Sequence, residues 1–445
     1  MFPGEGSRPA SFRKSFEGAV IANLASGSDQ PLHSSATRPQ SSDKAVALSL
    51  LWGTQFSSYA IRYALGVAAP ILMQQFNISA ETMGYVLSGW NWAYTASMMF
   101  VGMLVDRLGA WVVMGVGSVL WSLSTIALPI AATAASLFAM RAVFGLAHSM
   151  LIPTTAASVS RIFGPQERAR AIAVSYSGNQ VGLALGSPIA AYILHLAGWQ
   201  SVFYWMGSGS LLIAAAWIFL YPDRSKGSRA VRADAVSSAT LRPLSWGSLF
   251  RYRATWALAL GQAGYLYAFY FFVSWLPGYL VIERKMTILR TGLVGSLPFL
   301  AGLLGTLAGG WLADYLIRRG VDLTIARKSV IGAGLSASTG MVIAAAFTEQ
   351  TWLAVMFLVL CMFCLRLATG SIHSLPIELA PPSLVASLAG ISNFSANVSG
   401  IMAPILTGYI VTNTGSFVLA LVVAGGMALL GAVSFVFILG PVRKY

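Results

Sequence analysis

The sequence predicts an all-α membrane protein with twelve transmembrane helices in two pseudo-symmetric bundles of six. Three observations support this fold class. The 445 residues are 56% hydrophobic and only 9% charged, whereas soluble domains carry about 25% charged residues. Apolar stretches of about 20 residues, the length that crosses a bilayer as a helix, recur along almost the whole chain. Basic residues gather in alternate loops, which is typical of membrane proteins.

The helices are predicted in order from these apolar stretches. Residues 1–45 are rich in Ser, Pro, Gly and Arg, and are expected to form a disordered cytoplasmic tail. An N-terminal bundle at 46–221, a cytoplasmic linker at 222–253, a C-terminal bundle at 254–440 and a cytoplasmic tail at 441–445 follow. The predicted spans are 46–75, 82–105, 111–131, 134–160, 168–196, 199–221, 254–282, 288–314, 327–347, 351–377, 384–412 and 416–440.

The distribution of positive charge predicts the orientation. Of the 28 Lys and Arg residues, all but six lie in the two tails and in one set of alternate loops. Because cytoplasmic loops carry the excess of Lys and Arg, both termini are expected in the cytoplasm. The net charge of +14 therefore reflects membrane topology, and nucleic-acid binding is not expected.

The two halves of the chain contain an internal repeat. The segment that ends with Asp106 and Arg107 after the second span is echoed by the segment that ends with Asp314 after the eighth. In the fourth span Arg141, Gly145, His148, Ser149 and Ile152 match residues at one constant offset in the tenth, which are Arg366, Gly370, His373, Ser374 and Ile377. Parallel halves of this kind are a known transporter architecture.

Several motifs resemble those of the major facilitator superfamily and, within it, the anion:cation symporter family of bacterial sugar-acid and sialin-like carriers. Residues 102–109 (GMLVDRLG) resemble the superfamily's signature loop, although Ala110 and Trp111 replace its usual basic pair. The other matching stretches are 62–70 (RYALGVAAP), 121–125 (WSLST), 141–153, 167–171 (ERARA), 309–328 and 400–408 (GIMAPILTG). The resemblance implies a monomeric, lipid-embedded transporter of the bacterial inner membrane, without cofactor, metal or catalytic site.

Three arginines lie within the predicted spans: Arg62, Arg141 and Arg366. Each would cost about 2.5–3.5 kcal/mol if it faced lipid, so they must face a wet cavity or a partner. None of the 14 Asp and Glu residues falls in the middle of a span. We therefore expect a small organic anion as the counter-ion, because the planar guanidinium binds a carboxylate through two hydrogen bonds. The alternative is that some of these arginines bond to backbone carbonyls or lie near the membrane surface.

The resemblance also implies which residues bind the substrate. Gln55, Tyr59, Arg62 and Gly66 share one face of the first helix by their spacing, and this face would line the cavity. For Tyr94 packing in the core is an alternative, and for Trp275 a place in an aromatic interface belt is equally open. The implied substrate-binding residues are Tyr59, Arg62, Tyr94, Asn179, Trp275 and Asn393.

Two positions depart from the pattern of the proton-coupled members. Ile61 stands where they commonly have Asp, and His148 where they commonly have Glu. Histidine titrates near neutral pH, and a bound carboxylate would favour its protonated form, so anion and proton would promote each other's binding. His148 with Arg141 is therefore the candidate proton relay, and His373 with Arg366 the counterpart in the other half. A neutral, hydrogen-bonded histidine is the alternative.

A set of charges at the cytoplasmic ends of the helices is the candidate gate. The family uses charges in these loops as a latch between its two access states; here they could also serve only to set the topology. The predicted gate residues are Asp106, Arg107, Glu167, Arg170 and Asp314.

Together these features predict a secondary active transporter of a small organic anion, driven by protons. Sugar acids, dicarboxylates and aromatic carboxylates are the candidate cargoes, and Ile61 and Ile372 count against the most polar of these. An anion exchanger or uniporter is the alternative carrier. A receptor would bind without transport. An enzyme is not expected, because the chain has only four histidines and no mid-membrane carboxylate.

Overall fold

The computed structural model describes residues 41–224, 246–381 and 384–442, and these residues contain helices and no strand. The predicted tail is outside this part up to residue 40, and helix α2 already begins at Ser41. Most of the predicted linker, 225–245, and the last three residues are also outside it.

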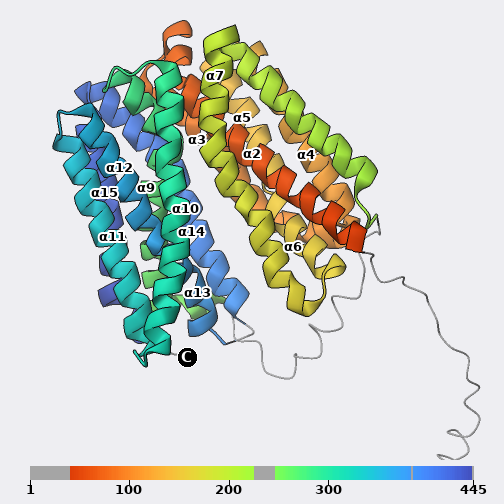
Figure 1. Ribbon diagram of the computed structural model, residues 1–445, viewed down its shortest axis with the longest axis vertical. Coiled ribbons are helices and arrows are strands. Elements are labelled where there is room, and N and C mark those ends of the chain that lie inside the picture. Colours follow the sequence, from red (N-terminus) through yellow and green to blue (C-terminus); the bar gives the residue numbers. More distant parts are fainter. Residues whose placement is uncertain (1–40, 225–245, 382–383, 443–445) are drawn as a thin grey trace, which may run out of the picture. The chain divides into compact units, whose positions relative to one another are not determined.

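The helices fall into two groups that follow each other along the chain (Figure 1). The first group contains α2 (Ser41–Gln75), α3 (Ala80–Leu108), α4 (Ala110–Ala127), the turn η1 (Leu128–Ile130), α5 (Ala134–His148), α6 (Leu151–Ile162) and α7 (Pro165–Leu220). The second contains η2 (Trp246–Arg251), α9 (Arg253–Ile282), α10 (Ile288–Arg318), α11 (Leu323–Phe347), α12 (Thr351–Leu367), α13 (Thr369–Leu379), α14 (Val385–Thr414), α15 (Val418–Val433) and η3 (Ser434–Ile438).

In the described part of the chain, ten helices are long and apolar enough to cross a membrane. Helix α7 counts once among them, although Gly198, with φ 79°, divides it into two helices. Helix α3 is 29 residues long but is not among the ten. Two of the ten spans join neighbouring helices, α5 with α6 and α12 with α13. Counting both parts of α7 and adding α3 gives the twelve helices that the sequence predicts.

Polar side chains and glycines fix where the helices begin and end. The Ser79 side chain accepts a hydrogen bond from the backbone of Thr82, and Asp322 does the same for α11. Such caps satisfy backbone N–H groups that lack an intrahelical partner. Helix α3 ends at Gly109, whose φ of 87° turns the chain directly into α4.

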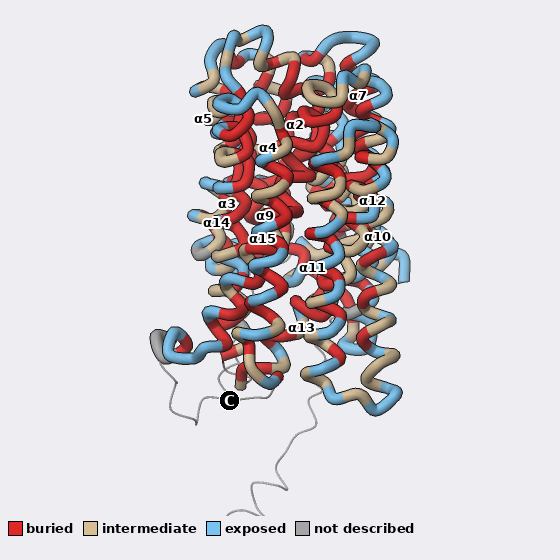
Figure 2. The backbone as a smooth tube through the Cα atoms, turned by 90° about the vertical axis from the view of Figure 1, so that its left-hand side faces the viewer, coloured by how far each residue is buried: buried red, intermediate tan, exposed pale blue. Residues whose placement is uncertain are grey.

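Small residues let the helices of each group pack closely. Gly178, Gly182 and Gly186 of α7 lie one turn apart, and each sits against the backbone of α2 with no room for a Cβ atom. In the second group Gly305 and Gly309 of α10 contact the backbone of α12 in the same way. Such contacts replace the hydrophobic driving force that is missing between helices in lipid. Figure 2 shows buried residues along the inner faces and exposed residues along the outer ones.

The two groups contact each other from one end of their helices inward to Met98 of α3, whose sulfur lies 3.6 Å from the Asn397 amide nitrogen of α14. At that end the backbone N–H of Glu81 on α3 donates to the Thr412 hydroxyl on α14, at 2.9 Å. The rings of Tyr63 on α2 and Phe299 on α10 lie 5.0 Å apart. At the opposite end the ion pairs lie within one group, as for Arg161 with Asp223.

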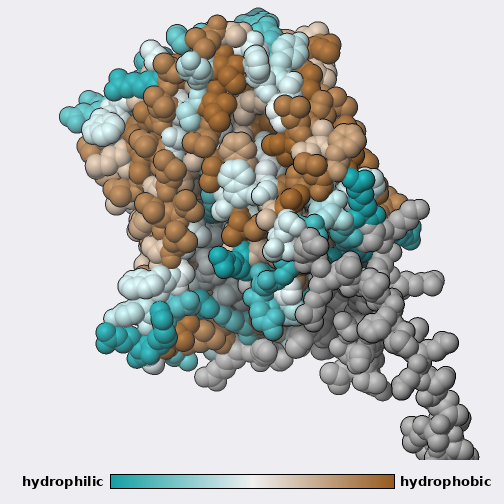
Figure 3. All heavy atoms as spheres, turned by 45° about the vertical axis from the view of Figure 1, so that its right-hand side comes forward, coloured by the Kyte–Doolittle hydropathy of each residue, from teal (hydrophilic) through white to brown (hydrophobic). Residues whose placement is uncertain are grey.

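The outer surface matches a lipid environment. Figure 3 shows hydrophobic side chains over most of the visible helical face, with hydrophilic ones gathered toward the lower end and at the upper edge. Large apolar side chains such as Phe100, Leu212 and Phe219 are more than 60% exposed. Soluble monomers rarely expose so much continuous apolar surface.

Candidate functional site: a buried arginine cluster

Helix α2 carries Arg62 into the interior of the first group. The three glycines of α7 hold α2 in place along the turns that precede Arg62. The Arg62 side chain is only 7% exposed. Its guanidinium lies 3.8 Å from the ring centroid of Trp90, 5.4 Å from that of Tyr59 and 5.2 Å from that of Tyr270. A cation on an aromatic face is stabilised by the ring quadrupole.

Helix α5 brings Arg141 and His148 beside the same rings. Gly145 lies between these two residues, and a Cβ atom there would overlap the backbone of Trp90 on α3. Because α5 and α3 touch at this point, the residues one turn to either side of Gly145 also face α3. Arg141 is 3% exposed, and its guanidinium lies 5.0 Å from the Phe144 ring centroid.

His148 is enclosed by aromatic side chains. Its ring centroid lies between 5.3 and 6.4 Å from those of five rings, which belong to Tyr59, Trp90, Tyr94, Trp121 and Phe144. The imidazole is buried, and its Nδ1 atom has no hydrogen-bond partner among the described residues. We call these residues, together with Arg62, Arg141 and Tyr270, the arginine cluster.

Neither arginine of the cluster has a counter-ion among the described residues. The buried Nε atoms of Arg62 and Arg141 form no hydrogen bond with any described residue. The ion pairs in the described part involve other cations, which are Lys44, Arg161 and Arg327. Arg62 and His148 both lie against the rings of Tyr59 and Trp90, so a proton on His148 would be close to the Arg62 charge. The cluster is therefore a cationic site with aromatic walls, suited to an anion.

The structure brings together five of the predicted residues: Tyr59, Arg62, Tyr94, Arg141 and His148. Asn179 is half-buried on α7, and its Oδ1 atom has no partner among the described residues. Asn393 on α14 is exposed and accepts a hydrogen bond from Asn397. No hydrogen bond joins Asn179 or Asn393 to a described residue of the cluster.

Trp275 lies away from the cluster. It is fully buried on α9, its indole N–H donates to the Pro404 carbonyl of α14 at 2.9 Å, and its ring packs on Phe417. These contacts give Trp275 a packing role between α9 and α14, which differs from both the cavity position and the interface belt.

The counterpart in the second half is arranged differently. The Arg366 Nη1 atom donates to the Tyr265 hydroxyl at 2.8 Å, and that hydroxyl also bonds to Thr369. The His373 Nδ1 atom lies 2.8 Å from the Thr369 carbonyl, and the side chain is exposed. These polar groups are therefore partly satisfied within the protein.

Sequence reasoning missed four members of the cluster: Trp90, Trp121, Phe144 and Tyr270. Trp90 is one turn before Tyr94 on the same face of α3, so the helical period was an available signal. Phe144 is similarly one turn before His148. Nothing in the sequence pointed to Tyr270, because it comes from α9 in the other group.

Ile61 does not lie in the cluster. It lines an apolar pocket of about 220 Å³ between α2 and the two parts of α7, together with Trp205 and Ser210. Ile372 is fully buried within α13. Neither residue is therefore evidence about the polarity of the arginine cluster.

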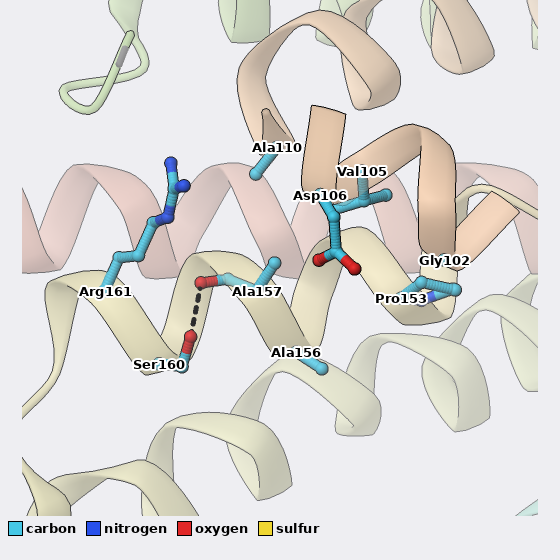
Figure 4. A pocket seen from close by; sticks show the side chains of 9 residues that line it. All are labelled: Gly102, Val105, Asp106, Ala110, Pro153, Ala156, Ala157, Ser160 and Arg161. Atoms are coloured by element: carbon cyan, nitrogen blue, oxygen red, sulfur yellow. Dashed lines mark hydrogen bonds between the residues drawn. The ribbon is translucent and has the colours of Figure 1, made fainter. Parts of the chain in front are cut away.

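The predicted gate residues lie at the opposite end of the helices from Glu81 and Thr412. Asp106 and Arg161 line a pocket of about 310 Å³ between α3 and α6, and Figure 4 shows their side chains on separate sides of it. Glu167 pairs with Lys44 at 2.7 Å. Arg107, Arg170 and Asp314 are exposed. Of the five predicted gate residues, Glu167 alone forms an ion pair within the described part of the chain.

A family model described as Major Facilitator Superfamily matches residues 51–404. The chain belongs to this superfamily. This transporter is 32% identical to the D-galactonate transporter of Escherichia coli O6:H1, over 90% of the chain and 96% of the relative. It is 32% identical to a probable galactarate/D-glucarate transporter of Escherichia coli K12, over 87% and 92%. It is 30% identical to the hexuronate transporter of Bacillus subtilis, over 90% and 96%.

The fold of this transporter also matches a solved structure. A bacterial homologue of the human lysosomal transporter Spinster, in an inward-facing and occupied conformation, aligns with a TM-score of 0.72 at 17% identity. The alignment covers 90% of this chain and 95% of the homologue. The fold class and the family predicted from the sequence are confirmed.

Proposed function

We propose that this transporter carries a small organic anion, in first place a sugar acid, across the bacterial inner membrane. The observation that carries the proposal is the pair of buried arginines, Arg62 and Arg141, which have aromatic neighbours and no protein counter-ion in the described chain. A carboxylate that entered the cluster would bind the edge of a guanidinium whose face is already covered by Trp90. The names of the three relatives support the choice of a sugar acid.

Unpaired polar groups nearby favour a cargo with hydroxyl groups. Gln55, Asn91 and Asn179 each have buried amide atoms without a hydrogen-bond partner among the described residues. Buried polar groups are costly unless a protein group, a water or a ligand satisfies them. Asn91 directly follows Trp90, and Gln55 lies on α2 two turns before Arg62. A polyhydroxylated acid offers donors and acceptors for such groups, whereas a purely aromatic acid does not.

Uptake into proteoliposomes tests this proposal. The purified full chain is reconstituted, and uptake of labelled D-galactonate is compared with uptake by the Arg62→Gln variant. We expect the variant to lose binding by about 2 kcal/mol or more, which is roughly 30-fold or more in affinity, because a buried charge pair is broken.

Arg290→Gln is the matched control, because Arg290 is exposed at the start of α10. It should transport like the unmodified chain. Uptake by the Arg62→Gln variant equal to that of the unmodified chain would contradict the proposed binding role of Arg62. D-glucarate and a simple aromatic acid, tested as competitors, rank the alternative cargoes.

We also propose an inward-facing state with both termini in the cytoplasm. The contacts between Glu81 and Thr412 and between Tyr63 and Phe299 would then close the outer end. Asp106, Arg107, Glu167, Arg170 and Asp314 would lie at the cytoplasmic gate. A double variant, Glu81→Cys with Thr412→Cys, should stop transport on oxidation and recover on reduction. Transport that continued after complete cross-linking would contradict alternating access through this end.

The driving force is a separate question with two candidate answers. In the first, His148 carries a proton together with the anion, because its unpartnered Nδ1 atom is adjacent to the binding arginines. His148→Gln should then abolish accumulation driven by an inward proton gradient while downhill uptake continues. In the second, the transporter exchanges one anion for another.

A further inference from the structure

After an anion has left, and until another binds, the transporter can change its access state only with the arginine cluster empty. The cluster contains two guanidinium groups, and neither forms a hydrogen bond or ion pair with another described residue. The described carboxylates lie in loops or toward helix ends, for example Glu81, Asp106 and Glu378. The positive charge of the cluster is therefore not balanced from within the membrane-spanning region.

Alternating access makes such a cluster pass through a state that is closed on both sides. The solvent contact that remains to the arginines, 7% exposure at Arg62 and 3% at Arg141, is then removed as well. Dehydration of an uncompensated charge is unfavourable, and it is offset only when an opposite charge is adjacent. A bound anion supplies this charge, whereas the empty cluster has only aromatic faces, which interact more weakly.

The second half of the molecule contains an arginine that does have a polar partner. Arg366 lies in the equivalent position of the repeat, but its guanidinium donates to the Tyr265 hydroxyl, which bonds in turn to Thr369. Arg62 and Arg141 have no such hydroxyl partner. The cost of closing an empty site thus falls on the first half.

We propose that this transporter is an obligatory anion exchanger, in which the cluster crosses between the two access states readily only with an anion bound. The inference rests on the proposed function, because it assigns the driving force for transport at the same site. One anion enters as another of the same kind leaves, so the exchange needs no proton and produces no net charge movement.

Efflux from proteoliposomes tests the inference. Vesicles that contain the full chain are loaded with labelled D-galactonate and diluted into medium with or without unlabelled D-galactonate. Potassium and valinomycin clamp the membrane potential, so that charge movement cannot limit net efflux. We expect efflux at least about tenfold faster with external anion, which corresponds to about 1.4 kcal/mol in the barrier.

A second variant keeps the test independent of folding defects. His148→Glu introduces a carboxylate seven residues after Arg141 on the same helix face. This carboxylate would balance the empty cluster, so the ratio of exchange to net efflux should fall toward one. The exposed Arg290→Gln variant should keep the ratio of the unmodified chain.

The outcomes separate the two proposals. Equal efflux with and without external anion would overturn the exchange mechanism and leave the anion-carrier proposal intact. Net efflux that reached the exchange rate only when a protonophore was added would overturn it in favour of proton coupling. Absence of flux in every arm would overturn both exchange and the sugar-acid cargo.

Discussion

Two segments of this transporter share a sequence pattern but have different surroundings. Residues 141–149 read RAVFGLAHS and residues 366–374 read RLATGSIHS. In the first, the arginine has no polar partner in the part of the chain that the structure describes, and the histidine is packed among rings. In the second, Arg366 bonds to Tyr265, and the Nδ1 atom of His373 bonds to a backbone carbonyl.

The two halves of the repeat keep the same arginine and histidine, but these side chains have different partners in each half. Because a carbonyl can only accept, His373 must carry a proton on Nδ1 to make its bond, and this fixes its tautomer. Tyr265, which comes from α9, satisfies Arg366. Nothing equivalent satisfies Arg141 in the described chain. The first segment is therefore suited to bind a ligand, and the second to hold its own helices together.

The largest effect is expected when each arginine is removed in turn. Arg141→Ala should weaken transport of labelled D-galactonate by roughly 30-fold or more, because a charged ligand contact of about 2 kcal/mol or more is lost. Arg366→Ala should weaken it by less than about tenfold, because it removes a hydrogen bond within the protein. Equal losses in a proteoliposome uptake assay would show that Arg141 and Arg366 contribute equally to transport.

The glycines of the repeat give the next comparison. A Cβ atom at Gly145 would overlap the Trp90 backbone, whereas at Gly370 it would meet the nearest atom, in Gly310, at 3.7 Å. Gly145→Ala should therefore destabilise the protein by about 1–3 kcal/mol through overpacking, and Gly370→Ala should change little. Thermal unfolding in detergent measures both variants. A stable Gly145→Ala protein with normal uptake would mean that α3 and α5 can move apart freely.

The histidines should differ by a smaller amount. His148→Gln replaces a ring that contacts five others, so we expect a loss of about 1–2 kcal/mol in stability from the packing defect. His373→Gln alters an exposed side chain and should stay within about 0.5 kcal/mol. The same unfolding assay compares them. A larger loss of stability in His373→Gln than in His148→Gln would contradict this expectation.

The smallest effect is expected at Tyr265. Tyr265→Phe removes the hydroxyl that bonds to Arg366 and Thr369 but keeps the ring. Loss of these bonds should cost about 1–3 kcal/mol if Arg366 stays buried, and less than about 1 kcal/mol if water replaces the hydroxyl. Since Arg366 is only half-buried, we expect the lower figure, with transport within about twofold of normal. A large loss of transport would instead give Arg366 a binding role.

Part of the site could be predicted from the sequence, because residues three, four or seven positions apart share a face of the folded helix. Arg141 and His148 are two turns apart and therefore share a face, and the same period joins Tyr59 to Arg62. The sequence could not predict Tyr270, because nothing local to α9 shows that this residue meets α2 and α3. Trp275 shows the opposite failure: its position in the family pattern suggested a substrate contact, yet its indole N–H bonds to α14.

The sequence by itself determined that this protein lies in a membrane, that it has a repeated helical fold, and that its buried charges are positive. These properties depend on composition and on periods within single helices, which the chain carries wherever it folds. Only the tertiary structure decided which arginine is free for a ligand. That choice depends on whether another helix, distant in sequence, supplies a hydroxyl, as α9 does through Tyr265 for Arg366 and does not for Arg141.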